Sequence, residues 1–155
     1  MYVYLVQHAL AKEKHEDPNR SLSDQGRTDI TKMTHFVAEH LTIDVNTIVH
    51  SGKTRAEETA GVLAEKLNPA GGVRTEGGLA PLDDPAIWAK RLESAAEDIM
   101  LVGHLPHLSK LAARLIWGDD SRTVVSFRNA GIVCLGRDDF TDWSVQWALF
   151  PDMLK

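Results

Sequence analysis

Four polar residues stand at or shortly after the ends of segments that the sequence predicts to be β-strands. They are His8, Ser51, Arg55 and His104. A neutral imidazole can attack phosphorus, a guanidinium can grip two phosphate oxygens, and a second imidazole can donate to the charge of the transition state. In open α/β sheets, ligands bind in the crevice at the carboxyl ends of the strands. The four residues therefore predict a site for phosphoryl chemistry at one edge of a sheet.

The elements that must position these residues alternate along the chain. Short β-branched and apolar runs predict strands over residues 2–7, 46–50, 73–75, 99–102, 123–127, 132–137 and 144–149. Apolar residues at helical spacing predict helices that begin near Ser23, Ser51, Asp84 and Pro106. The first three of these residues can each cap a helix with a side-chain oxygen. We expect an α/β fold, a three-layer sandwich with a mostly parallel central sheet and helices on both faces, formed by one domain over residues 1–155.

The composition is that of an ordinary globular protein, with 155 residues of which 43% are hydrophobic and 25% charged. The net charge of −5 offers no basic face, so we expect neither nucleic acid nor an anionic membrane as a partner. No apolar run is long enough to span a bilayer, and the N-terminus does not resemble a signal peptide, so we expect a cytoplasmic protein. The single cysteine, Cys134, is expected to be a small buried residue of a strand.

Four short segments resemble, in the same order along the chain, the motifs of the histidine phosphatase superfamily. Residues 5–9, LVQHA, resemble L-x-R-H-G/A, and residues 20–26, RSLSDQG, resemble R-P-L-S/T-x-x-G. Residues 51–60, SGKTRAEETA, resemble S-P-x-x-R-A-x-Q/E-T-A, and residues 102–106, VGHLP, resemble a G-H-x-P-like block. The chain length and the H-x-P block resemble the short phosphohistidine phosphatase branch, the SixA-like group, which has a phosphoglycerate mutase-like fold.

The resemblance implies that His8 is the nucleophile and forms a phosphohistidine intermediate, which water then hydrolyses. Arg55 and His104 would bind and polarise the phosphoryl oxygens as the other catalytic residues. The expected phosphate-binding set is Gln7, His8, Arg20, Ser51, Arg55 and His104. No metal or cofactor is implied, and although His104 and His107 have a spacing that metals use, no further ligand lies near them in the sequence.

The short branch lacks the large inserted lid of the sugar-phosphate enzymes, and the segment between Glu76 and Met100 is too short to supply one. An open pocket suits a phosphorylated protein side chain, with phosphohistidine as the expected substrate. A small phosphate ester is the other class of substrate that such a phosphatase would hydrolyse. A transfer of phosphoryl groups between sugar phosphates is not favoured.

The sequence departs from the motifs at Gln7, which stands where the family has arginine. One charge-assisted hydrogen bond contributes about 1.5–3 kcal/mol, so its loss predicts turnover that is about ten- to a hundredfold slower. Lys12, Arg20, Arg27 and Lys53 lie on segments that can approach the crevice, and Arg20 is the first choice to replace the missing charge. The alternative function is a catalytically weakened module that binds a phosphorylated ligand or protein.

Two further departures are glycines. Gly52 replaces the usual proline and leaves room for the backbone to approach an anion. Gly78 aligns with the family position that often supplies a carboxylic general acid, so the proton donor is unassigned. Asp83 or Asp84 can be considered for this role, although a helix cap is the favoured interpretation of Asp84. Because an imidazole leaving group is easily protonated, the missing acid favours phosphohistidine as the substrate.

Overall fold

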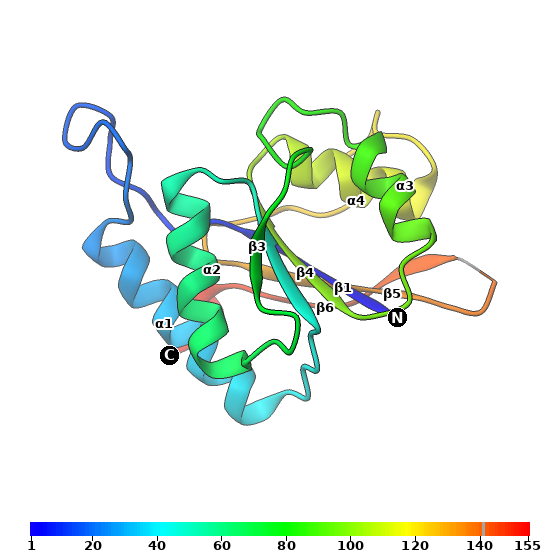
Figure 1. The fold of residues 1–155 in the computed structure, drawn as a ribbon, viewed down its shortest axis with the longest axis horizontal. Coiled ribbons are helices and arrows are strands. Elements are labelled where there is room, and N and C mark those ends of the chain that lie inside the picture. The colour runs from blue at the N-terminus through cyan, green and yellow to red at the C-terminus, as the bar shows by residue number, and fades with distance from the viewer. Residues whose placement is uncertain (141) are drawn as a thin grey trace.

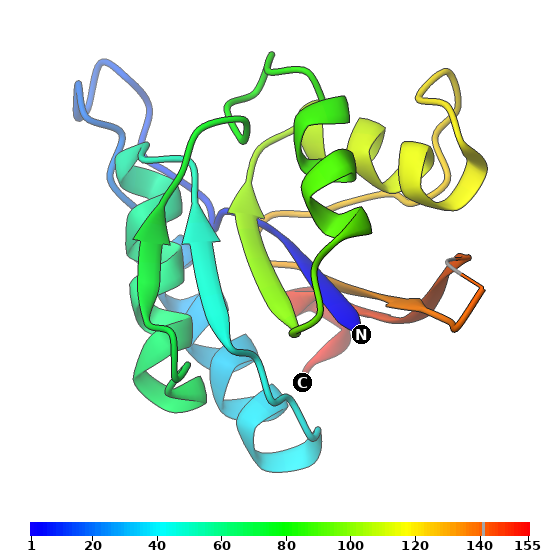
Figure 2. The same cartoon turned by 45° about the vertical axis from the view of Figure 1, so that its right-hand side comes forward.

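A computed structural model describes residues 1–140 and 142–155 and shows one central sheet between two layers of helices (Figure 1). The helices α1, Asp24–His40, and α2, Thr54–Leu67, cover one face of the sheet. The helices α3, Ala86–Glu93, and α4, His107–Trp117, cover the other (Figure 2). The expected three-layer α/β sandwich is therefore confirmed. Within the described ranges, no helix has both the length and the apolar character that crossing a membrane requires.

The sheet has six strands in the order β3-β2-β4-β1-β5-β6. In chain order they are β1 Tyr2–Gln7, β2 Thr47–His50, β3 Val73–Thr75, β4 Ile99–Gly103, β5 Ile132–Arg137 and β6 Trp143–Leu149, and a 3₁₀ helix, Pro151–Met153, follows them. β3, β2, β4 and β1 are parallel, whereas β5 is antiparallel to both β1 and β6. The expectation of a mostly parallel sheet is therefore wrong, because the sheet is mixed.

The path of residues 118–131 explains the mixed sheet. After α4 the chain returns to the carboxyl ends of the parallel strands, where the backbone N–H of Ala130 donates to the Gln7 carbonyl at 3.0 Å. β5 therefore begins beside the end of β1 and runs in the opposite direction. The strand expected over 123–127 is also wrong, since the structure forms no strand there. Val125 and Phe127 pack against the cluster that α3 and α4 form with the sheet, whereas Val124 is exposed.

The three expected helix caps have different outcomes. Ser23 caps α1, because its hydroxyl oxygen accepts the backbone N–H of the residue three positions on, at 3.0 Å. Asp84 accepts the Ala86 N–H at 2.9 Å, next to the start of α3. Ser51 does not cap α2, since the N-cap residue is Lys53, whose side chain makes no capping bond. The Ser51 hydroxyl is occupied elsewhere, in the candidate site.

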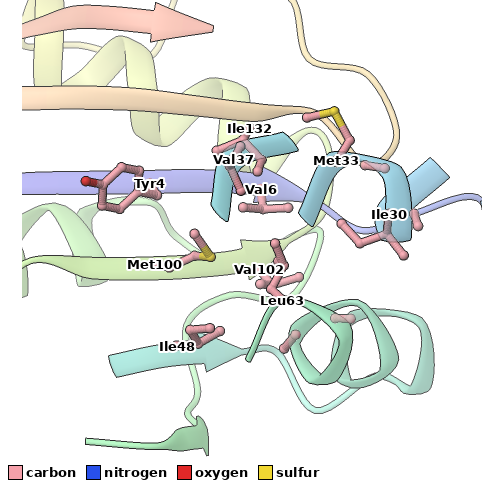
Figure 3. Packing of buried hydrophobic residues seen from close by; sticks show 14 of the residues in the cluster. Tyr4, Val6, Ile30, Met33, Val37, Ile48, Leu63, Met100, Val102 and Ile132 are labelled. Atoms are coloured by element: carbon pink, nitrogen blue, oxygen red, sulfur yellow. The ribbon is translucent and has the colours of Figure 1, made fainter. Parts of the chain in front are cut away.

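Alternate residues of β1 face the two helical layers, as the two-residue period of a strand requires. Tyr4 and Val6 pack with α1 and α2 (Figure 3), whereas Val3 and Leu5 pack with α3 and α4. Cys134 lies buried in the first cluster, where burial raises its pKa to about 12, as expected for an unreactive core thiol. β1 is therefore packed on both faces, and this packing fixes the position of its carboxyl end.

The segment after His8 is pressed against the start of α1. The Leu10 carbonyl accepts the Ser23 N–H at 2.9 Å, and a short β-bridge joins the two segments. Gly26 makes this approach possible, because a Cβ at that position would lie 2.1 Å from the Leu10 carbonyl oxygen. The contact holds the residues that precede α1 beside the carboxyl end of β1.

Gly26→Ala is expected to lower the free energy of unfolding by about 1–3 kcal/mol, because the added methyl group overlaps backbone rather than a flexible side chain. Gly61→Ala is the matched control: a Cβ there meets nothing within 4 Å, and alanine in a helix is favoured over glycine by about 0.5–1 kcal/mol. Urea unfolding of both variants measures the difference. Equal stabilities of Gly26→Ala and the parent protein would contradict this packing.

Candidate active site

His8 follows β1, and hydrogen bonds fix both its backbone and its ring. The backbone N–H donates to the Gly103 carbonyl at 3.0 Å, and ring Nδ1 lies 2.7 Å from the Ala9 carbonyl oxygen. Because a carbonyl oxygen only accepts, Nδ1 carries the proton and Nε2 keeps its lone pair. Burial lowers the pKa of His8 to about 4 against the opposing Ala9 carbonyl, and Arg55 and Arg20 add to the shift. His8 is therefore a neutral imidazole, the form that can attack phosphorus.

His104 follows β4 and is buried, with 1% of its surface exposed. Its ring centroid lies 5.0 Å from that of His8, so the two imidazoles line the same space. Its Nε2 is 2.6 Å from the hydroxyl oxygen of Ser51. Burial lowers the pKa of His104 to about 3, and the nearby His8 and Arg55 lower it further. The structure thus brings together predicted site residues from the ends of three different strands.

Two arginines lie beside these imidazoles. Arg55 is in the first turn of α2, and its buried Nε has no hydrogen-bond partner. Arg20 donates its Nε–H to the Lys12 carbonyl at 3.1 Å. Burial lowers the pKa of Arg55, and the charge of Arg20 lowers it further. In the part of the chain that the structure describes, neither arginine forms an ion pair, so both are available to an anion.

The four cationic residues that could replace the charge missing at Gln7 have different surroundings in the structure. Arg20 is beside His8 and Arg55, as described, and Lys53 is close enough to lower the pKa of His104. Arg27 instead pairs with Glu58 at 2.9 Å. Lys12 contributes its backbone carbonyl, which orients the Arg20 guanidinium. These contacts favour Arg20, with Lys53 as a second cation near His104.

Gln7 ends β1, opposite Gly103 of β4, and adds no charge to the site. Its backbone carbonyl accepts the Ala130 N–H at 3.0 Å. Its side-chain Oε1 is buried and has no hydrogen-bond partner among the described residues. A buried amide oxygen without a donor is costly, so the Gln7 side chain beside His8 does not contribute a favourable hydrogen bond to the fold through this atom.

Two residues that the motifs did not predict as site residues, Glu58 and Thr59, bind the backbone segments around the site. Thr59 Oγ1 accepts the Ala9 N–H at 3.0 Å, which ties α2 to the segment after His8. Glu58 Oε2 accepts the Leu22 N–H at 2.7 Å and so anchors the loop that carries Arg20. Both residues belong to the segment SGKTRAEETA, residues 51–60, so its resemblance to the family motif was the feature of the sequence that could have identified them.

A third structural contact comes from the segment before β5. Asn129 donates its side-chain N–H to the His8 carbonyl at 2.9 Å. The sequence around it offered only the signal of a turn, Asn129-Ala130-Gly131, and nothing that linked it to the site. This contact depends on a long return of the chain, which local sequence patterns do not indicate.

The positions considered for a general acid are a glycine and two aspartates that accept backbone N–H groups. Gly78 has a φ of +89°, and a Cβ there would lie 2.9 Å from Ile87 Cγ2, so a side chain at this position would require its neighbours to shift. Asp83 Oδ2 accepts the Ala80 N–H at 2.9 Å, and Asp84 Oδ1 accepts the Ala86 N–H at 2.9 Å, just before α3, whose N-cap residue is Pro85. Both aspartates are therefore used to shape the loop that leads into α3.

His107 lies in the first turn of α4 and is fully buried. Neither of its ring nitrogens makes a hydrogen bond of acceptable geometry among the described residues, although the Gly78 carbonyl lies near enough to raise the pKa of His107. Burial is the larger influence and lowers the pKa of His107, with Asp83 and Asp84 opposing. Across residues 1–140 and 142–155, no three or more potential metal ligands cluster, so His104 and His107 are not part of a recognisable metal site.

His107→Leu is expected to raise the free energy of unfolding by about 1–3 kcal/mol near neutral pH, because two buried nitrogens without partners are removed. The gain should increase as the pH falls below about 6.5, since the unfolded chain then binds a proton that folded His107, with its lowered pKa, does not. Urea unfolding at neutral and mildly acidic pH measures both effects.

The control is His35→Leu, which changes an exposed histidine of α1 and should alter stability by less than about 0.5 kcal/mol. A marked loss of stability in His107→Leu at neutral pH would show that the ring nitrogens are hydrogen-bonded after all.

Comparison with known proteins gives a clear result for the fold. Neither a model of a protein family nor a curated protein matches the chain in sequence. The protein histidine phosphatase SixA, in a structure with tungstate, is 22% identical over 100% of both chains, with a TM-score of 0.86. The putative phosphohistidine phosphatase SixA of Agrobacterium tumefaciens is 19% identical over 96% of both chains, with a TM-score of 0.74.

A third similar structure is a putative alpha-ribazole-5'-P phosphatase of Escherichia coli, which is 14% identical, with a TM-score of 0.76. The match covers 97% of this chain and 98% of that one. The resemblance to the histidine phosphatase superfamily that the motifs indicate is therefore confirmed in the fold. The chain has the phosphoglycerate mutase-like fold of SixA-type phosphatases over its whole length.

Proposed function

We propose that this protein is a phosphatase in which His8 accepts the phosphoryl group. The observation that carries the proposal is the hydrogen bond between His8 Nδ1 and the Ala9 carbonyl, which leaves the lone pair on Nε2. The lowered pKa keeps the ring neutral, and Arg20 and Arg55 stand beside it without acidic partners. The nucleophile and the groups that bind its target are thus assembled at one place.

The reaction has two steps. In the first, His8 Nε2 forms a bond to phosphorus while the bond from phosphorus to the leaving group breaks, and the leaving group takes a proton from water. In the second, water attacks the phosphorus, the phosphorus–nitrogen bond breaks, and inorganic phosphate and neutral His8 are released. Arg20 and Arg55 hold the phosphoryl oxygens. His104 and Ser51, which contact each other at 2.6 Å, supply hydrogen bonds that stabilise the negative charge of the transition state.

We propose phosphohistidine on a protein as the substrate. No carboxylic acid faces the His8 and His104 pair among the contacts described above, because Gly78 carries no side chain and Asp83 and Asp84 bind backbone. Imidazole leaves readily once it is protonated by solvent, whereas an alkyl alcohol needs an enzymic acid. A phosphoramidate therefore suits these residues better than an alkyl phosphate does.

The enzyme should hydrolyse a phosphohistidine peptide and an activated aryl phosphate, and His8→Ala should abolish both reactions because the attacking atom is removed. Rapid quenching of the parent protein should trap a phosphoryl adduct on His8, detected by mass spectrometry. His35→Ala changes an exposed histidine of α1 and should leave both rates unchanged. Continued turnover by His8→Ala would rule out the proposed nucleophile.

A second candidate function is a module that binds a phosphorylated protein without hydrolysing it. It is favoured by Gln7, whose buried Oε1 has no partner and whose amide supplies no charge next to the nucleophile. Such a module would bind phosphate analogues through Arg20 and Arg55 and release no phosphate. Turnover of the parent protein decides between the two functions.

Arg20→Ala is expected to lower kcat/KM about ten- to a hundredfold, because one charge-assisted hydrogen bond to the phosphoryl group is lost. Gln7→Arg should raise kcat by a similar factor, since it adds a charge beside His8. Arg27→Ala is the matched control for Arg20, because its guanidinium pairs with Glu58, and it should change kcat/KM less than about threefold. Equal effects of the two arginine substitutions would mean that Arg20 does not bind the phosphoryl group.

A further inference from the structure

A buried imidazole, that of His50, lies directly before Ser51 in the chain. His50 ends β2 and is 4% exposed. Its Nδ1 accepts the Gly52 backbone N–H at 3.1 Å, and its Nε2 lies 3.3 Å from Thr75 Oγ1 on the neighbouring strand β3. Because an amide N–H only donates, Nδ1 is the unprotonated nitrogen and Nε2 donates to Thr75. One buried ring therefore joins the turn after β2 to the end of β3.

The bond to His50 depends on the residue that forms the turn. Gly52 has a φ of +91°, a backbone conformation that glycine adopts readily. Proline, which stands here in the motif that this segment resembles, has no N–H to donate and cannot adopt this φ. A Cβ on Gly52 would also lie 3.1 Å from the Thr75 methyl group. His50 and Gly52 thus form one local arrangement that replaces the rigidity a proline would supply.

Ser51 lies between the two residues that this bond joins, so the bond limits the directions that its side chain can take. Its hydroxyl oxygen lies 2.6 Å from His104 Nε2 and also accepts the Lys53 N–H at 3.4 Å. Lys53 is the N-cap of α2, and Arg55 is in the first turn of that helix. A change in the turn is therefore transmitted to the Ser51 hydroxyl beside His104 and to the Arg55 guanidinium.

We propose that His50 is a positioning residue, which acts through the Gly52 N–H to hold Ser51 against His104 and α2 against the phosphoryl site. The proposal rests on the proposed function for its kinetic consequences, although its effect on anion binding is separate. Burial lowers the pKa of His50, with Glu57 opposing, so the ring is neutral and able to accept at neutral pH.

The test compares His50→Asn with His50→Leu. Asparagine places its Oδ1 where the ring has Nδ1, so it keeps the acceptor for Gly52, whereas leucine of similar size has none. We expect His50→Leu to lower kcat about tenfold or more with KM changed less than about threefold, because misplacing a catalytic group costs more in the transition state than in binding. His50→Asn should retain kcat within about threefold of the parent.

Affinity for vanadate, measured by calorimetry, is the second readout, because this anion mimics the transition state of phosphoryl transfer. It should weaken about tenfold in His50→Leu and little in His50→Asn. Urea unfolding checks that the variants are folded. If His50→Leu does not fold, Thr75→Val supplies the comparison, since it frees the ring from β3 and should lower kcat and vanadate affinity to a smaller extent.

The outcomes separate the two proposals. A parent protein that binds vanadate but releases no phosphate would contradict the proposed function, while the vanadate affinities of the variants would still test His50. A folded His50→Leu with the kcat and vanadate affinity of the parent would overturn the positioning role. So would a loss in His50→Asn as large as that in His50→Leu, because the acceptor at this position would then not matter.

Discussion

The hydrogen bond from His8 Nδ1 to the Ala9 carbonyl, 2.7 Å long, decides which nitrogen of the His8 ring keeps its lone pair. Without it the proton could occupy either nitrogen, and the lone pair would face phosphorus only part of the time. The bond requires that the Ala9 carbonyl be fixed, and the Thr59 hydroxyl does this by accepting the Ala9 N–H. Much of the structure around β1 can be understood as support for this one carbonyl.

The electrostatics of the site follow from burial more than from charge. His8 and His104 are taken out of water, and this is the main reason why their pKa values fall to about 4 and about 3. Arg20 and Arg55 then add positive charge that no carboxylate neutralises among the described ion pairs. A protein of net charge −5 can in this way attract an anion, because the local groups determine the potential around His8.

The sequence predicted best the features that depend on local patterns of residues. The ends of β1, β2 and β4, and hence the meeting of His8, Ser51 and His104, follow from local apolar runs and from the geometry of parallel strands. The antiparallel β5 did not follow, because it depends on where residues 118–131 carry the chain rather than on the pattern of β5 itself. The position of Ser51 was predicted but its role as a cap was wrong, since its hydroxyl binds His104.

The most direct test of the account is a crystal structure of the protein with vanadate. We predict that vanadium bonds to His8 Nε2, that the Ala9 carbonyl still accepts from Nδ1, and that the vanadate oxygens contact Arg20, Arg55 and His104. Vanadate bound elsewhere, or bound at the arginines while His8 turns its protonated nitrogen towards the anion, would contradict it.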